Sequence, residues 1–163
     1  MKKISVILVL LLILPGCATI YQPKGFTGGY SETLMKENLY RVSFRGNGFT
    51  SQERAFDFAL LRCSELSLLH NYNYFAIVDA SSYVSRSTYV TPTTTKTYSN
   101  IQLYDNYAYG SATSTTYGGQ VYNIKKPRIT LVVLCFKEEP NIKATVFDAT
   151  FLSKSIRLKY KLK

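Results

Sequence analysis

Apolar and polar residues alternate strictly over residues 39–45, where tyrosine, valine and phenylalanine occupy every second position and arginine or serine the positions between. This period of two is typical of a strand with one buried face. The Gly-Asn-Gly run at residues 46–48 then predicts a tight turn. We therefore expect a half-buried strand that ends at this turn.

Residues 51–69 change to a helical period. Thr50 and Glu53 have the spacing of a capping box, in which a hydroxyl and a carboxylate each bond an unpaired amide at a helix start. One side of the predicted helix carries the apolar residues Ala55, Ala59, Cys63 and Leu66, widened by Phe56, Leu60 and Leu69. A helix with such a side is expected to pack on a sheet.

Two short apolar runs predict buried strands. One is residues 74–78, which could continue to Tyr83, and the other is residues 129–136, which is rich in β-branched side chains. Three strands and one covering helix define the fold class. We predict an α+β fold, a small two-layer sandwich in which one main helix covers an antiparallel or mixed sheet.

The C-terminal stretch fits two structures. Residues 156–163 alternate apolar and basic residues, as a lysine-guarded edge strand does. Asp148 could instead cap a helix that carries Phe151, Leu152 and Ile156. We expect the helix, followed by a basic tail that is either a solvated end or a contact with anionic lipid or cell wall.

A long insert at residues 81–123 is rich in Ser, Thr, Tyr and Gly and has no apolar periodicity. Segments of this length are usually functional or disordered. Because threonine and tyrosine favour extended chain, one interpretation is a projecting hairpin that orders on a partner, and the other is a mobile insert without a ligand. In the first case the contacts with a partner or with sugar rings would come from Tyr104, Tyr107, Tyr109 and Tyr117.

The N-terminus has the order of an export signal: two lysines, an apolar run over residues 4–14, and then Pro15, Gly16 and Cys17. The run is shorter than the roughly 20 residues that a membrane-spanning helix needs. Residues 14–17 also resemble a bacterial lipobox, whose cysteine becomes the acylated first residue of the mature protein. A secretory signal that happens to contain a cysteine is the alternative.

From this pattern we predict a lipoprotein signal peptide over residues 1–16, a lipidated tether over residues 17–29 and a single domain over residues 30–163. Glycines and Pro23 in residues 18–29 suit a tether. Ala18 stands where an aspartate would resemble an inner-membrane retention signal, so we expect the periplasmic side of the outer membrane. Hydrophobic residues make up 46% of the chain, which is enough for one folded core.

The formal net charge is +10, and +8 without the two lysines of the signal. A basic envelope protein favours anionic surfaces such as lipid head groups, lipopolysaccharide phosphates or peptidoglycan carboxylates. Nucleic acid would suit the charge, but an export signal removes it as a partner.

Catalytic patterns are sparse. His70 is the only histidine, so no metal site is expected, and its place at a helix end favours a structural role. Glu138 and Glu139 would point to opposite faces of a strand, which is poor geometry for paired acid and base catalysis. Cys63 and Cys135 are both expected between helix and sheet, where a disulfide and two buried thiols are both open. We expect no catalytic residue and no cofactor.

Three segments carry a resemblance: GGYSE at residues 28–32, YRVSFRGNGFTSQERAFDFALLRCSEL at residues 40–66 and NYNYFAIVD at residues 71–79. They resemble a largely uncharacterised family of small proteobacterial outer-membrane lipoproteins. The resemblance covers the first half of the mature domain, whereas the insert and the basic tail are particular to this chain. It implies a lipoprotein that faces the periplasm, and it brings no catalytic residues.

These patterns lead to a non-enzymatic, lipid-anchored subunit of an envelope assembly, such as a secretion or cell-wall-spanning complex, with envelope proteins as partners. The alternative is a module that binds glycan or anionic lipid at the cell wall or outer membrane.

Overall fold

The computed structural model describes residues 18–163, so the predicted signal peptide and Cys17 lie outside the described residues. The chain divides into two units, which we describe separately. The body contains the described residues up to Ser85 and resumes at Lys125. The hairpin unit is Arg86–Ile124, close to the insert expected at residues 81–123.

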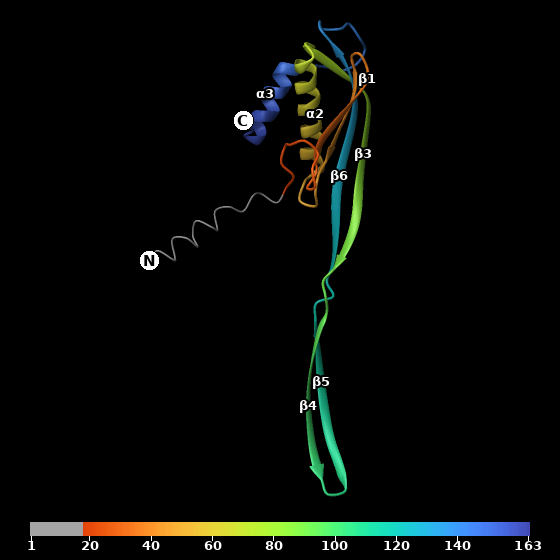
Figure 1. Cartoon of the computed structure of the whole chain (residues 1–163), viewed down its shortest axis with the longest axis vertical. Helices are drawn as coiled ribbons and strands as arrows, with labels where there is room; N and C mark the ends of the chain where they lie inside the picture. Colours follow the sequence, from red (N-terminus) through yellow and green to blue (C-terminus); the bar gives the residue numbers. More distant parts are fainter. Residues whose placement is uncertain (1–17) are drawn as a thin grey trace, which may run out of the picture. The chain divides into compact units, whose positions relative to one another are not determined.

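The body is built on a five-stranded sheet with two helices on one of its faces (Figure 1). The strand order is β1-β2-β6-β3-β7, and the pairs β1–β2, β2–β6 and β3–β7 are antiparallel. The strands are β1 (Gly29–Lys36), β2 (Leu39–Arg45), β3 (Tyr74–Val90), β6 (Val121–Phe136) and β7 (Val146–Asp148), and the helices are α2 (Gln52–Leu69) and α3 (Ala149–Tyr160). This arrangement confirms the predicted α+β fold.

The core lies between the sheet and the helices because β2 and β6 each bury every second residue. Val42 and Phe44 on β2 are fully buried, as are Leu131 and Val133 on β6. The strand predicted at residues 39–45 is therefore confirmed together with its buried face. Strands β3 and β6 were also predicted, but each extends beyond its apolar run, to Val90 and back to Val121.

The N-cap of helix α2 lies one residue later than the cap expected from the sequence. Its N-cap is Ser51, whose hydroxyl accepts a hydrogen bond from the Arg54 amide at 3.1 Å. The predicted capping box of Thr50 and Glu53 is wrong, because the Thr50 hydroxyl instead donates to Asn47 and accepts from the Thr19 amide. Thr50 thus connects the turn before the helix to the start of the folded chain.

The structure confirms the predicted buried side of α2 for Ala55, Ala59, Leu60, Cys63 and Leu66, but not for the two residues expected to widen it, Phe56 and Leu69. Phe56 and Leu69 are 38% and 69% exposed, whereas Phe58 is 2% exposed. The reason is that α3 packs beside α2, so that the ring of Phe58 meets the ring of Tyr160 at 4.9 Å. Sequence periodicity places a helix against one layer, and here a second helix covers a further side.

Helix α3 settles the C-terminal alternatives. Asp148 caps it by accepting a hydrogen bond from the Phe151 amide at 2.8 Å. Ile156 is buried and Leu152 packs against the core, while Phe151 is 73% exposed. The helix prediction is confirmed in place of the edge strand.

The chain already belongs to the body at Thr19, which is 2% exposed. The Thr19 hydroxyl donates to the carbonyl of Thr27 at 2.9 Å, and the Tyr30 amide bonds the Gln22 carbonyl at 2.9 Å. Gly28 has a φ of 109°, and a Cβ there would collide with the Arg45 carbonyl. Within the expected tether of residues 17–29, the described residues from Thr19 on are thus hydrogen-bonded to the body at several points, and Thr19, Gly28 and Gly29 are buried.

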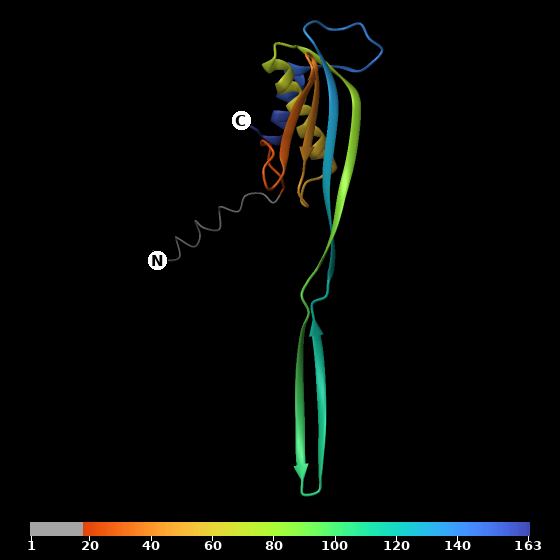
Figure 2. The same ribbon diagram turned by 45° about the vertical axis from the view of Figure 1, so that its right-hand side comes forward.

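The hairpin unit contains the two-stranded sheet of β4 (Thr94–Tyr104) and β5 (Tyr107–Tyr117), shown in Figure 2. Residues 105 and 106 form the turn between them. At the other end of the ladder the Thr91 amide bonds the Gln120 carbonyl at 2.9 Å. The insert is thus an extended hairpin in the structure.

Candidate interaction site

The register of the β4–β5 ladder sorts its side chains onto two faces. It contains 11 antiparallel residue pairs, from Thr94 opposite Tyr117 to Tyr104 opposite Tyr107. Directly opposed residues point to the same side of a sheet, and neighbours along a strand point to opposite sides. The composition of each face therefore follows from the register.

One face, which we call the tyrosine face, collects the aromatic side chains. Tyr107, Tyr109 and Tyr117 are 66%, 69% and 59% exposed and stand on this face with Tyr98, which is 70% exposed. The predicted contact residue Tyr104 has the same register position, but its side chain is outside the described atoms. Tyr98 is not among the contact residues expected from the sequence, because only its register with Thr113 places it beside the others.

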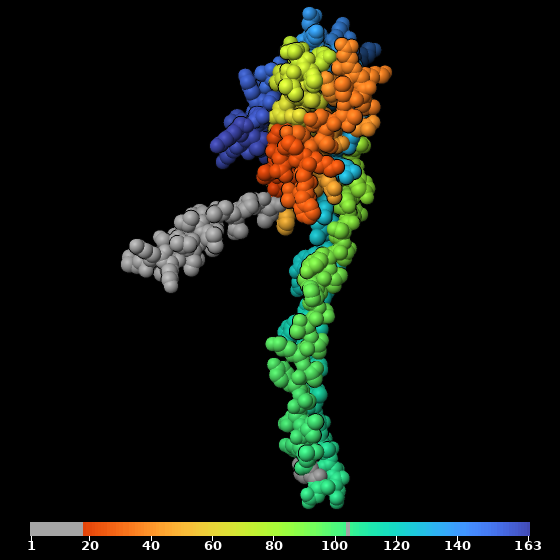
Figure 3. Space-filling model, viewed as in Figure 1, coloured from red at the N-terminus to blue at the C-terminus, as the bar shows by residue number. Residues whose placement is uncertain are grey.

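The opposite face carries small and hydroxyl side chains. Two cross-strand hydroxyl pairs connect the strands, Thr95 with Thr116 at 2.9 Å and Thr97 with Ser114 at 2.8 Å. Nearer the turn this face presents Ile101 and Leu103, which are 66% and 81% exposed. Both faces of the ladder are open to solvent, because every described residue of β4 and β5 is exposed, and Figure 3 shows the face of this unit turned to the viewer.

The two outer edges of the ladder carry almost no charge. Between Thr94 and Tyr117 the only charged residues are Lys96 and Asp105. Among residues 18–163, no further strand pairs with either side of this two-stranded sheet. Natural edge strands are usually blunted by charges, prolines or covering elements, and an unblunted edge is a template for pairing with another chain.

The two remaining cysteines are free thiols in the body. Cys63 and Cys135 are 0% and 1% exposed, and the Cys135 sulfur lies 3.3 Å from the Ser67 hydroxyl. Burial raises the pKa of both thiols. Of the two alternatives from the sequence, the structure contains the pair of buried thiols.

The carboxylates of α2 are engaged in ion pairs with α3. Lys159 donates to Glu53 at 2.6 Å and to Asp57 at 2.7 Å, and Arg157 donates to Glu65 at 2.5 Å. The Tyr21 hydroxyl also donates to Glu65, and burial together with this hydrogen bond raises the pKa of Tyr21. These groups hold the helices and the N-terminal segment together.

His70 occupies the C-cap of α2 and stacks on Tyr40, with the ring centres 5.3 Å apart. Its expected structural placement agrees with this contact. Within residues 18–163, no group of three or more His, Cys, Asp or Glu side chains is arranged to hold a metal ion. A hollow of about 420 Å³ between α2 and the sheet is lined mainly by apolar atoms of Phe56, Ile129 and Leu131.

Neither described helix is long and apolar enough to cross a membrane. Comparison with protein-family models, with curated proteins and with solved structures gives no match to this chain. The candidate site is therefore defined by its geometry: an exposed ladder with a tyrosine face and two open edges.

Proposed function

We propose that the protein is a non-enzymatic lipoprotein, anchored by acylated Cys17 to the periplasmic side of the outer membrane. It serves as an accessory subunit of an envelope assembly such as a secretion or cell-wall-spanning complex. The hairpin unit makes the contact with the partner protein, through the tyrosine face and the open edges of β4 and β5.

One observation carries this proposal: the β4–β5 ladder has no core of its own. Every described side chain of its two strands is exposed. An isolated two-stranded hairpin is at best marginally stable in water, because a third strand or a packed face is needed to offset the chain entropy. A segment of this length with open edges gains that missing surface when a partner adds a strand or covers a face.

The tyrosines suit such a contact. Tyrosine offers a large rigid apolar surface with a polar tip, and it is enriched among the residues that dominate binding energy. Tyr98 and Tyr109 are both about two-thirds exposed, so burying them would remove a large apolar area from water. The nearly uncharged ladder also avoids the cost of desolvating ions at an interface.

In-cell photocrosslinking tests the proposal. A photoreactive amino acid replaces Tyr109 on the tyrosine face or Leu103 on the opposite face, and adducts are identified by mass spectrometry. The matched control is Phe151 on α3, which is 73% exposed, against 69% for Tyr109. We expect discrete envelope-protein adducts from the hairpin positions and none from the control position.

A Cys17→Ala variant checks the anchor in the same cells. It should lose acylation and membrane fractionation, and the hairpin adducts should weaken because the protein leaves the membrane. Absence of any protein adduct from both hairpin positions, in acylated protein at its normal level, would contradict the assembly role.

The alternative is a glycan-binding module, and the alignment of tyrosines on one face favours it as the second candidate. Aromatic rings on a flat exposed face can stack on sugar rings. Sedimentation with purified cell wall separates the two roles. In the alternative, Tyr98→Ala and Tyr109→Ala abolish sedimentation, and Leu103→Ala on the opposite face leaves it intact.

A further inference from the structure

Two aromatic side chains stand exposed on neighbouring turns at one end of the body. Phe26 occupies the tip of a tight turn closed by the Gly25 amide on the Gly28 carbonyl at 2.9 Å, and its side chain is fully exposed. Phe49 lies in the turn before α2 and is 72% exposed. Neither ring has an apolar partner in the core cluster. Exposed phenylalanines on adjacent turn tips are typical of a surface that meets another apolar phase.

Thr19 joins these two turns. Its hydroxyl donates to the Thr27 carbonyl at 2.9 Å and accepts from the Asn47 amide at 2.8 Å. Its amide donates to the Thr50 hydroxyl at 3.0 Å. Cys17 is only two residues earlier, and two residues span at most about 7 Å. A lipid on Cys17 would therefore be attached within about 7 Å of chain from Thr19, the residue that bonds both turns.

Four cations surround the same turns. Lys24, Arg45 and Arg128 line one hollow of about 230 Å³ together with hydroxyls of Ser31, Ser43 and Thr130. Arg45 and Lys126 line a second hollow of about 230 Å³ that includes Phe26. No carboxylate lines either hollow, and none of the ion pairs among the described residues involves these cations.

Two arginines at this basic end indicate an anion-binding site. Arg45 on β2 and Arg128 on β6 stand directly opposite each other in the register, and both are exposed. Like charges at directly opposed positions destabilise a sheet. An anion between them would remove that repulsion and accept hydrogen bonds from two guanidinium groups and the neighbouring hydroxyls. By contrast, Arg62 on α2 is paired with Glu32 on β1 at 2.7 Å.

We propose that this end of the body docks on a membrane that contains anionic phospholipid. Phe26 and Phe49 enter the boundary between head groups and acyl chains, while Lys24, Arg45, Lys126 and Arg128 bind head-group phosphates. Peripheral proteins bind this boundary through buried apolar area together with electrostatic attraction to anionic lipids. The inference rests on the proposed acylation of Cys17. It adds that the acylated protein does not hang from the membrane on a flexible tether. The body instead lies against the membrane with its N-terminal end.

The chain contains no tryptophan, so a single introduced tryptophan reports on its own position. We would reconstitute the full acylated protein into phosphatidylcholine vesicles, with and without phosphatidylglycerol, and quench with brominated lipids. The reporters are Phe26→Trp and Phe49→Trp. The control is Phe151→Trp, matched to Phe49 in exposure at 73% against 72%.

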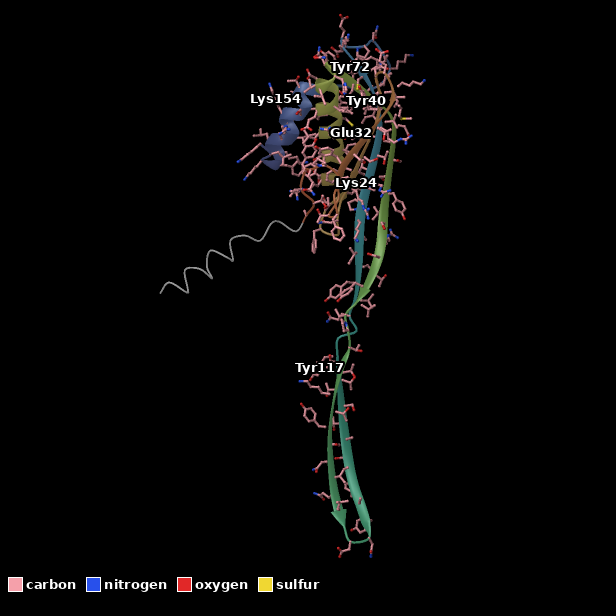
Figure 4. All side chains as sticks on the ribbon, viewed as in Figure 1. Lys24, Glu32, Tyr40, Tyr72, Tyr117 and Lys154 are labelled. Atoms are coloured by element: carbon pink, nitrogen blue, oxygen red, sulfur yellow. The ribbon has the colours of Figure 1, made fainter. Side chains whose placement is uncertain are left out.

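The control position lies at the opposite end of the body. Phe151 is in the first turn of α3, where the Ala149 amide bonds the Asn73 carbonyl just beyond the C-terminal end of α2. Phe49 precedes the N-terminal end of that helix, and 18 residues of helix span about 27 Å. In Figure 4, Lys24 and Tyr72 are labelled at these two ends of the body.

We expect brominated lipid to quench Phe26→Trp and Phe49→Trp several-fold more than Phe151→Trp, with a blue-shifted emission, and more strongly with phosphatidylglycerol present. Adding Arg45→Gln and Arg128→Gln should lower the quenching in anionic vesicles to the level in neutral ones, without changing Phe151→Trp. Equal quenching at all three positions overturns the docking. Quenching that is the same with and without phosphatidylglycerol, and the same after Arg45→Gln and Arg128→Gln, overturns the phosphate contacts.

Mass spectrometry and vesicle flotation of the unsubstituted protein keep the two proposals apart. An acylated, floating protein whose turn tryptophans stay unquenched refutes the docking and leaves the anchor standing. A protein without acyl chains refutes the anchor, and the same quenching measurement then tests whether the phenylalanines and cations bind the vesicle unaided.

Discussion

The position of Phe58 gives a direct test of how α2 is seated. Its ring is 2% exposed and meets three other rings edge-on, those of Tyr21, Phe44 and Tyr160, with ring centres 4.9–5.5 Å away. Phe58→Ala removes the contact point of the N-terminal segment, the sheet and α3 at once. A buried phenylalanine truncated to alanine costs about 3–5 kcal/mol.

Phe56 is the matched control because it lies on the same helix and is 38% exposed. Phe56→Ala should cost less than about 1 kcal/mol, as partly exposed sites do. Phe58→Leu keeps most of the volume and should cost at most about 1.5 kcal/mol. Both alanine variants lose the same side chain. The test is therefore the ratio of their losses in the free energy of unfolding.

Urea unfolding followed by far-ultraviolet circular dichroism measures this, because the helices are confined to the body. With a slope of about 2 kcal/mol per M, Phe58→Ala should lower the unfolding midpoint by roughly 2 M. Phe56→Ala should shift it by less than about 0.5 M. Equal losses for the two variants, or a larger loss for Phe56→Ala, would refute the observed burial of Phe58 and favour the burial of Phe56 that periodicity predicted.

Three further predictions concern the body. Burial and a hydrogen bond to a carboxylate raise the pKa of Tyr21, so the folded state holds this proton more tightly than the unfolded chain. The Tyr21 contribution to the free energy of unfolding is therefore constant below about pH 10 and falls as the pH rises beyond it. We would measure the free energy of unfolding of the wild type and of Tyr21→Phe at a series of pH values above about 10. The value for Tyr21→Phe should decrease less steeply with pH than the value for the wild type. Cys63 and Cys135 are buried with raised pKa values, so a thiol reagent should modify both in urea and neither in the native protein within the same time; rapid native labelling would contradict the burial. Gly28→Ala should lower stability by more than about 1 kcal/mol, because its φ of 109° and the nearby Arg45 carbonyl exclude a Cβ. Gly25→Ala meets only an ordinary contact at 4.0 Å and should leave the unfolding midpoint unchanged.

Local pattern was sufficient for the elements whose burial is decided by a single neighbour. The period of two over residues 39–45 predicted β2 and its buried face, because one side of that strand meets the helix layer and the other meets solvent. Asp148 predicted the start of α3 since capping is a contact between residues three apart. The α+β class followed from three predicted strands and the helix predicted over residues 51–69.

Long-range contacts decided what the pattern could not. Thr50 has the sequence of a helix cap, but its hydroxyl is taken by Thr19, which is 31 residues away in the chain. Phe58 and Phe56 are equally apolar, but the N-terminal segment, the sheet and α3 all pack on the ring of Phe58, and Phe56 stays partly exposed. The segment before Tyr30 has the composition of a tether, yet hydrogen bonds to distant turns fix it to the body.

The candidate surfaces show the same division. Composition alone marked the insert as extended and rich in tyrosine, but the face on which each ring stands depends on the pairing of β4 with β5. The basic end of the body has no sequence signature at all, because Lys24, Arg45, Lys126 and Arg128 come from three separate parts of the chain. The sequence by itself predicted β2, β3, β6, α2 and α3 and the buried face of β2. Only the tertiary structure brought the four cations and two phenylalanines to one end, because strand pairing joins positions that no local period relates.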